Sequence, residues 1–225
     1  MKKFITAFLV LTLAFVFGCN AFALEYAQEW DKYTSVSTVS FSDVQDHWAK
    51  EEIARVVEKG WFNGYPDGTF HPNATITRSE AMTVFVKFLG IQPKVVDESS
   101  YTDVKLTDWF SPYIEAGKKL FPEIEVFNGE LPFNPNQPIT RETTIYALVT
   151  ALRYTDDTRF ADQSILNMFK DQSSISYLVK PYAAVAVDMG LVSGYPDGSI
   201  GGQDPLTRAE FAAMLYRATF FGTNG

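Results

Sequence analysis

The sequence predicts a mainly α-helical fold made of three helix–loop–helix repeats, on three observations. A short motif of an aromatic residue, a polar residue and Asp occurs three times, beginning at Phe41, Tyr101 and Phe169. Each copy is followed by a stretch with apolar residues at helical spacing, then a loop, then a second such stretch. A Thr-Arg pair opens every second stretch. A chain that repeats itself in this way uses one supersecondary unit several times.

The repeats fix the expected domain boundaries. We expect repeat 1 over residues 41–90, repeat 2 over residues 101–154 and repeat 3 over residues 168–221. Residues 24–40 form a polar leader without a convincing apolar period. A unit of about 55 residues buries too little surface to be stable alone, so the repeats are expected to share one core.

The loops carry strong turn signals in two of the repeats. Gly64 and Tyr65 open the sequence Gly-Tyr-Pro-Asp-Gly in repeat 1, and Gly194 and Tyr195 open the same sequence in repeat 3. Pro presets φ, Asp bonds back to the chain and Gly accepts a positive φ, so both segments predict tight turns. In repeat 2 this loop is lost, and residues 128–130 read Asn-Gly-Glu instead.

The Thr of each Thr-Arg pair is expected to cap the second helix of its repeat. The residues with this structural role are Thr77 with Glu80, Thr207 with Glu210, and Thr140. In repeats 1 and 3 a Glu three residues after the Thr completes a capping box. In the second repeat Thr143 stands where the Glu would be, so its box is incomplete.

Capping does not explain the Arg that follows each Thr. Arg78, Arg141 and Arg208 all lie in the first turn of a helix, where a cation faces the positive end of the helix dipole. A helix N-terminus with free N–H groups and a guanidinium beside it is a good carboxylate or phosphate site. The alternative is that each Arg pairs with a structural carboxylate of a neighbouring repeat.

Composition and charge exclude several classes of function. The chain has 225 residues and a net charge of −8, which disfavours nucleic acid as a partner because phosphate backbones require clustered Lys and Arg. His47 and His71 are the only histidines, and neither has a partner at metal or catalytic-triad spacing. Neither Pro-Asp-Gly loop has the alternating carboxylates of a calcium loop. We therefore expect no enzyme activity, no cofactor and no metal.

The first 23 residues predict a signal peptide. Two N-terminal lysines precede an apolar run over residues 4–17, and residues 21–23 read Ala-Phe-Ala, the pattern of a cleavage site. The run is shorter than the ~20 residues of a spanning helix, so we expect secretion with cleavage after Ala23 rather than a retained anchor. Lipidation of Cys19, the one cysteine, is a minor alternative.

Together these motifs resemble those of the S-layer homology family. The shared elements are the aromatic-x-Asp-Val start followed by His47-Trp48, the Gly-Tyr-Pro-Asp-Gly loop and the Thr-Arg-Ala-Glu motif. Repeat 3 matches the last motif completely, repeat 1 differs only at Ser79, and repeat 2 keeps only the Thr-Arg pair. The resemblance covers residues 41–221, nearly all of the expected mature chain.

The resemblance implies a pseudo-threefold, spindle-like body whose inter-repeat grooves hold a secondary cell-wall polymer, commonly through pyruvylated N-acetylmannosamine ends. It implies that the motif Arg contacts the pyruvyl carboxylate and that the loop Tyr, with its flanking Gly, contacts sugar. The residues it assigns to the polymer are Arg78, Arg141, Arg208, Gly64, Tyr65, Gly194 and Tyr195. We expect at least one groove, one that uses repeat 2, to be altered.

The first helix of each repeat is expected to open with an aromatic residue: Trp48, Trp109 or Tyr177. We expect the two tryptophans to anchor the core, with an indole edge that lines a groove as the alternative. The overall expectation is a non-catalytic module of the bacterial cell surface that binds cell-wall polysaccharide, with other surface-layer proteins as further candidate partners. A peptidoglycan-linked target beneath an outer membrane and a self-assembling S-layer component remain as alternative readings.

Overall fold

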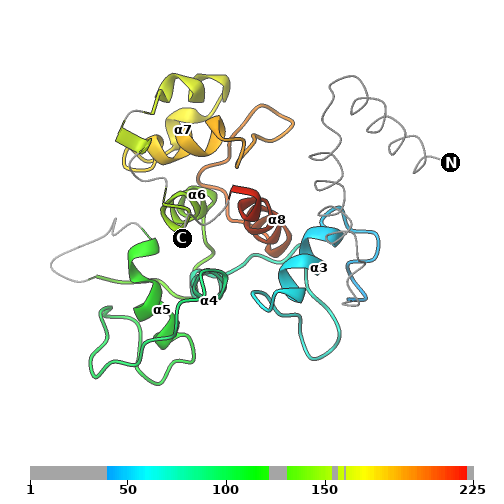
Figure 1. Ribbon diagram of the computed structural model, residues 1–225, viewed down its shortest axis with the longest axis vertical. Helices are drawn as coiled ribbons and strands as arrows, with labels where there is room; N and C mark the ends of the chain where they lie inside the picture. The colour runs from blue at the N-terminus through cyan, green and yellow to red at the C-terminus, as the bar shows by residue number, and fades with distance from the viewer. Residues whose placement is uncertain (1–39, 122–130, 154–156, 160, 222–225) are drawn as a thin grey trace, which may run out of the picture. The chain divides into compact units, whose positions relative to one another are not determined.

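The computed structural model describes residues 40–121, 131–153, 157–159 and 161–221 (Figure 1). The predicted signal peptide, the leader up to residue 39 and the altered loop at residues 128–130 lie outside the described residues. Within the described ranges the regular elements are helices, and the β-type pairing is limited to isolated bridges. The predicted mainly α-helical fold is therefore confirmed, whereas the spindle-like outline stays a prediction.

Each repeat contributes a first, shorter helix and a second helix of eleven residues. The first helices are α3 (Lys50–Glu58), α5 (Ser111–Gly117) and α7 (Lys180–Asp188). The second helices are α4 (Arg78–Phe88), α6 (Arg141–Ala151) and α8 (Arg208–Ala218). Short 3₁₀ helices complete the described chain: η1 (Lys118–Leu120), η2 (Asp157–Arg159), η3 (Gln163–Met168), η4 (Gln172–Ser174) and η5 (Thr219–Phe221).

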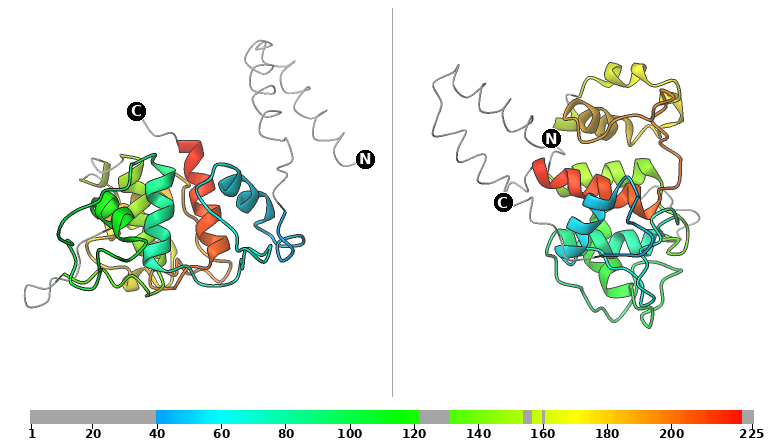
Figure 2. Two further views of the ribbon diagram at one scale, coloured as in Figure 1. Left: turned by 90° about the horizontal axis from the view of Figure 1, so that it is seen from below. Right: turned by 90° about the vertical axis from the view of Figure 1, so that its right-hand side faces the viewer.

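The two helices of a repeat pack on different repeats rather than mainly on each other. Helices α4, α6 and α8 lie together in the middle, and α3, α5 and α7 lie around them (Figures 1 and 2). The first helix of each repeat packs on the second helix of the repeat before it: α5 on α4, α7 on α6, and α3 on α8. The last of these pairings joins repeat 1 to repeat 3, so the arrangement closes on itself.

A ring of three backbone hydrogen bonds lies where the second helices begin. The amide of Ile76 donates to the carbonyl of Leu206 (3.1 Å), that of Leu206 to Ile139 (3.0 Å), and that of Ile139 to Ile76 (3.0 Å). All three side chains are fully buried. Because each bond joins a different pair of repeats in the same direction, the repeats are related in cyclic order.

The Asp of the repeated motif holds the end of the loop in every repeat. Asp43 accepts hydrogen bonds from the amides of Phe70 (2.9 Å) and His71 (2.7 Å). Asp103 accepts from Phe133 and Asn134, and Asp171 from Ile200 and Gly201, at 2.7–2.9 Å. The second residue of each pair has a positive φ, between 55° and 64°. The carboxylate thus fixes a left-handed turn that two non-glycine residues would otherwise adopt reluctantly.

The two tryptophans of the repeated motif do not anchor the core, and that expectation is wrong. Trp48 is 63% exposed and Trp109 is 61% exposed. The large fully buried aromatic side chains are phenylalanines, among them Phe70, Phe85 and Phe211. The rings of Phe85 and Phe211 meet edge-on across repeats 1 and 3. The indoles lie one residue before the helix caps Ala49 and Phe110, and it is these cap residues that turn inward.

Candidate functional site

The starts of the second helices, with the loops that cover them, form the candidate site. Thr77 and Thr207 each accept a hydrogen bond from the amide of the Glu three residues on, and that Glu accepts from the Thr amide in return. Thr140 accepts from the amide of Thr143, and the two hydroxyls lie 2.9 Å apart. The first turn of every second helix is therefore held by its own side chains.

The remaining N-terminal amides of these helices are already bonded to the next repeat. The Arg78 amide donates to the carbonyl of Gln137, that of Arg141 to Asp204, and that of Arg208 to Ala74, at 2.8–3.0 Å. The amides of the residues that follow, at positions 79, 142 and 209, donate to carbonyls of the same loops. The first two amides of each second helix are thus not free to bind an anion, so the anion-site prediction rests mainly on the guanidiniums.

Arg208 is buried and joins repeat 3 to repeat 1. Its Nε donates to the carbonyl of Phe70 (2.8 Å) and an Nη donates to the carbonyl of Asn63 (2.9 Å). The guanidinium lies 4.6–4.9 Å from the ring centroids of Phe62, Tyr65 and Phe70. Burial lowers the pKa of Arg208 from its usual value. These two hydrogen bonds go to backbone carbonyls, not to the structural carboxylate that formed the alternative expectation.

Arg141 has a similar place between repeats 2 and 3. An Nη donates to the carbonyl of Ser193 (2.7 Å), and the guanidinium lies 4.8 Å from the ring centroid of Tyr195. The side chain is buried, and its Nε has no hydrogen-bond partner among the described residues. Arg141 and Arg208 therefore both connect repeats beneath a loop tyrosine.

Arg78, between repeats 1 and 2, is the least covered of the three. Its Nε donates to the carbonyl of Phe133 (2.7 Å), and the guanidinium lies 5.1 Å from the ring centroids of Phe121 and Phe133. It is partly exposed rather than buried. It also lines a hollow of about 320 Å³, together with polar side chains that include Asn134, Gln137, Thr140, Thr143 and Gln203.

Glu142 is a residue of this region that the sequence did not single out. It stands at the Ala position of the Thr-Arg-Ala-Glu motif, and its buried carboxylate accepts hydrogen bonds from the amide and hydroxyl of Ser176. It thereby joins the start of α6 to the start of α7 and forms part of the wall of the hollow. A charged residue in place of the motif Ala was the signal that pointed to it.

The loop glycines and tyrosines of repeats 1 and 3 make close contacts within the fold. A Cβ on Gly64 would collide with the ring of Phe41, and a Cβ on Gly194 with the ring of Phe169, so only glycine fits there. The Tyr195 hydroxyl donates to Glu210 of the capping box (3.1 Å), and burial, more than any other cause, raises the pKa of this phenol. Tyr65 is 40% exposed and is the more accessible of the two tyrosines.

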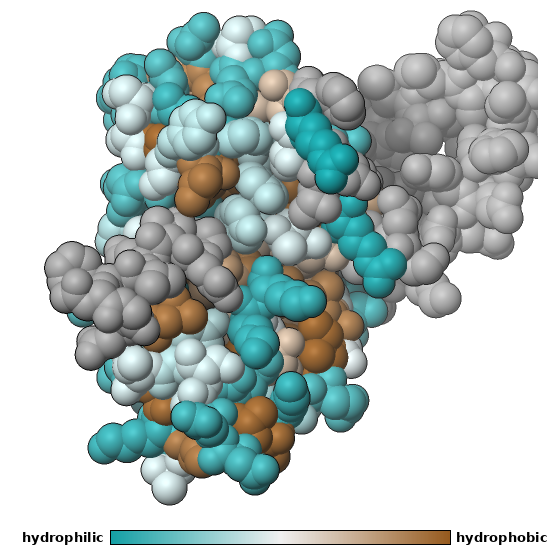
Figure 3. Space-filling view, turned by 90° about the vertical axis from the view of Figure 1, so that its left-hand side faces the viewer, coloured by the Kyte–Doolittle hydropathy of each residue, from teal (hydrophilic) through white to brown (hydrophobic). Residues whose placement is uncertain are grey.

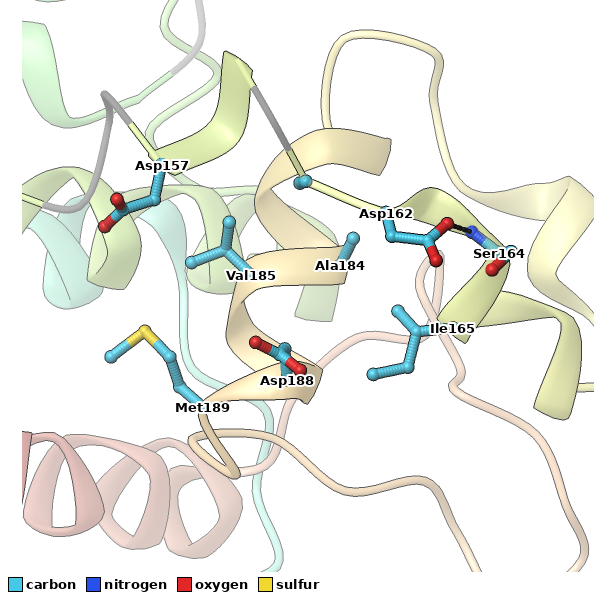
Figure 4. A pocket seen from close by; sticks show the side chains of 9 residues that line it. Asp157, Asp162, Ser164, Ile165, Ala184, Val185, Asp188 and Met189 are labelled. Atoms are coloured by element: carbon cyan, nitrogen blue, oxygen red, sulfur yellow. Dashed lines mark hydrogen bonds between the residues drawn. The ribbon is translucent and has the colours of Figure 1, made fainter.

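A second hollow lies apart from these helix starts, against α7. Its volume is about 680 Å³, and η2, η3 and α7 form its walls (Figure 4). Asp157, Asp162 and Asp188 surround it, and Ile165 and Met189 give it an apolar side. Asp162 is already occupied as the cap of η3, where it accepts from the amide of Ser164 (2.9 Å).

The described surface mixes apolar and polar residues. Apolar residues reach it in separate small patches between polar ones on the face shown in Figure 3. Among the described residues there is no group of three or more His, Cys, Asp or Glu side chains placed to hold a metal ion. No helix in the same part of the chain has the length and apolar character needed to cross a membrane.

Comparison with known proteins agrees with the internal repeats. A family model described as "S-layer homology domain" matches residues 40–82 and 169–212, which lie in the first and third repeats. The chain is 30% identical over 202 residues to an amylopullulanase of Thermoanaerobacterium thermosulfurigenes, a match that covers 89% of this chain and 10% of the relative.

Two further relatives carry surface names. The chain is 29% identical to the surface-layer 125 kDa protein of Lysinibacillus sphaericus, over 76% of this chain and 14% of that protein. It is 45% identical to a cellulosome-anchoring protein of Acetivibrio thermocellus, over 36% of this chain and 19% of that protein. The chain thus spans less than a fifth of the length of each of these three relatives.

Proposed function

We propose that this chain, which carries S-layer homology domains at residues 40–82 and 169–212, is a non-covalent anchoring module that binds bacterial cell-wall polysaccharide. The proposal includes export by the N-terminal signal and a place at the cell surface. Relatives named as surface-layer and cellulosome-anchoring proteins support it. Other relatives are named as enzymes, but the matched part is 10% of the amylopullulanase, so we assign no catalysis to this chain.

The observation that carries the proposal is the placement of Arg78. It is partly exposed, it lines the 320 Å³ hollow, and the rest of that hollow offers amides and hydroxyls suited to sugar hydroxyl groups. Arg141 and Arg208 are buried beneath tyrosines. We therefore assign the primary anion contact to Arg78, with the carboxylate of a pyruvylated polymer end as the ligand group that the family resemblance suggests.

The absence of the Gly-Tyr-Pro-Asp-Gly loop from repeat 2 changes which rings lie against the motif Arg. In repeats 1 and 3 a loop tyrosine covers the motif Arg of the preceding repeat. In repeat 2 the rings against Arg78 are Phe121 and Phe133, which do not bring a hydroxyl to the guanidinium. Because Arg78 is partly exposed and lines the hollow, we propose that the groove between repeats 1 and 2 is the principal binding groove.

The experiment is a binding assay with purified wall sacculi, before and after removal of the non-peptidoglycan polymer. Arg78→Gln keeps a donor for the Phe133 carbonyl but removes the charge. A charge-assisted contact contributes about 1.5–3 kcal/mol, so we expect affinity for untreated sacculi to fall about tenfold or more. Arg55→Gln removes the same charge from α3, where Arg55 pairs with Glu58 away from the hollow, and is the matched control.

Two results would contradict the proposal. Binding of the unaltered chain that survives removal of the polymer would place the target in the peptidoglycan itself. Equal affinity of the Arg78 and Arg55 variants would remove Arg78 from the site. A pair of sacculi with and without pyruvyl groups then tests the ligand group, because only the pyruvylated form should distinguish Arg78→Gln from the unaltered chain.

A further inference from the structure

Every repeat exposes a large apolar side chain at the same place in its fold. The residue directly before the cap of the first helix is Trp48 in repeat 1, Trp109 in repeat 2 and Leu178 in repeat 3. Their exposed fractions are 63%, 61% and 55%. The structure thereby corrects the sequence alignment, because Leu178 rather than Tyr177 takes the place of the tryptophans.

Packing does not account for these exposed side chains. Burying a side chain of this size stabilises a protein by about 1.5–3 kcal/mol, and these three forgo most of that gain. The ring contacts of the indoles are with neighbours in sequence, His47 for Trp48 and Phe110 for Trp109, both at 5.4 Å between centroids. A single exposed apolar residue is ordinary, but the same position exposed in three repeats indicates a surface that is used.

Two of these positions lie beside the starts of the second helices. His47, next to Trp48, has its Nε2 3.2 Å from Oδ1 of Asn73, and the residues on both sides of Asn73 accept the first amides of α8. In repeat 3, Ser176 lies two residues before Leu178, bonds Glu142 at the start of α6 and lines the hollow that contains Arg78. Trp48 and Leu178 are therefore placed near the starts of the second helices, and Trp109 has the equivalent position in repeat 2.

The charge of the molecule indicates which ligand surface these side chains suit. The net charge of −8 disfavours a second copy of the chain on the same faces, because like charges repel. It also gives no general attraction for an anionic polymer. An indole instead offers a flat apolar ring that needs no charge on its partner. Beside the indole of Trp48 lies the polar ring of His47, which in turn contacts Asn73. A sugar ring, with a C–H face and hydroxyls around it, matches both features.

We propose that Trp48 and Trp109, at equivalent exposed positions in repeats 1 and 2, are stacking platforms for uncharged sugar rings of the wall polymer. This inference rests on the proposed function and divides it into two parts. The guanidinium binds the charged end group and the indoles bind neighbouring neutral sugars. Repeat 3, which has Leu178 and Tyr177 instead of an indole, provides a weaker platform.

The test uses the whole chain and purified sacculi that retain their polymer, at low and at high salt. Stacking does not depend on charge, so Trp48→Ala with Trp109→Ala should weaken binding about tenfold at both salt concentrations. Arg78→Gln should lose affinity mainly at low salt, because salt screens its contact. Trp48→Phe with Trp109→Phe keeps a ring at each place and should recover much of the affinity.

Phe220→Ala is the control, because Phe220 is 59% exposed and its ring contacts Tyr216 within its own repeat. Unchanged affinity of the double Ala variant, or a loss confined to low salt, would overturn the platforms while leaving the anchoring function in place. A loss in the Phe variant equal to that of the Ala variant would also overturn them. If the unaltered chain fails to bind sacculi, the proposed anchoring function is wrong, and the proposed stacking role of the tryptophans is wrong as well.

Discussion

At the scale of single residues, the same motif Arg has different surroundings in each repeat. Arg208 lies beneath Phe62, Tyr65 and Phe70, Arg141 lies beneath Tyr195, and Arg78 lines an open hollow. The residues that surround the guanidinium differ from repeat to repeat, and they belong to the following repeat rather than to the helix that carries the Arg. A repeated motif therefore predicts the position of the Arg on its helix. The residues of the neighbouring repeat determine how far the guanidinium is buried.

Arg208→Ala is expected to destabilise the protein rather than act only on binding. The change removes the Arg donor from the carbonyls of the buried Phe70 and of Asn63, and it empties the space between three aromatic rings. We expect the free energy of unfolding in urea to fall by about 3 kcal/mol. Arg55→Ala, on a partly exposed side chain, should change it by about 0.5 kcal/mol or less. Equal small losses in both variants would show that Arg208 does not support the fold.

At the scale of elements, local chemistry was readable from the sequence and long-range pairing was not. Helix positions, the caps at Thr77, Thr140 and Thr207 and the turns at the Pro-Asp-Gly loops depend on neighbours within a few residues. The use of the helix N-terminal amides by carbonyls of the next repeat depends on residues about 60 or more positions away. No periodicity in one sequence reports such a contact, so the sequence could not show that these amides are already hydrogen-bonded.

The exposure of the tryptophans was missed for a related reason. Residues Trp48 and Trp109 precede apolar helices and are themselves large and apolar, so pattern alone places them inside. The structure turns the next residue, Ala49 or Phe110, toward the core instead. A shift of one position at a helix start changes which side chain faces solvent, and such boundaries are the least certain part of a sequence pattern.

The Asp that holds each loop should make the stability of the protein depend on pH. Burial is the largest single influence and raises the pKa of Asp43, but the hydrogen bonds from the amides of Phe70 and His71, with smaller contributions, together outweigh it and hold the pKa below the usual 3.8. A carboxylate whose pKa is lower in the folded state stabilises above its unfolded pKa, and that stability is lost as the pH falls through the folded pKa. We expect Asp43→Asn to cost about 1 kcal/mol at pH 7.

The measurement is urea unfolding of the Asp43→Asn variant and the unaltered chain from pH 7 to pH 2. The difference between them should be constant at neutral pH and shrink once the pH falls below about 3.8, the usual value for Asp. Asp46→Asn, three residues away on the exposed surface, is the control and should show little difference at any pH. A difference in the free energy of unfolding that stays constant down to pH 2 would contradict the role given to the Asp43 carboxylate.

At the scale of the whole molecule, the described repeats form a closed cycle of contacts. Each first helix packs on the second helix of the preceding repeat, and the bonds of Ile76, Ile139 and Leu206 form a ring with one residue from each repeat. The motif Arg side chains follow the same order, from repeat 1 to 2, 2 to 3, and 3 to 1. Every groove thus requires two neighbouring repeats, and the cycle is complete only with all three.

Removal of repeat 1 should therefore lower the free energy of unfolding by more than one third, because it also opens the cycle of contacts. A chain of residues 91–221 keeps α5, α6, α7 and α8, but α8 loses its contact with α3 and α5 loses its contact with α4. Two of the three ring bonds disappear with Ile76. Apolar faces of α5 and α8 would lie open, so we expect loss of cooperative unfolding in thermal circular dichroism, in contrast to a sharp transition for residues 40–221. A two-repeat chain that melts sharply as a monomer would show that closure of the cycle is not required, since folding units that need only nearest neighbours behave in that way.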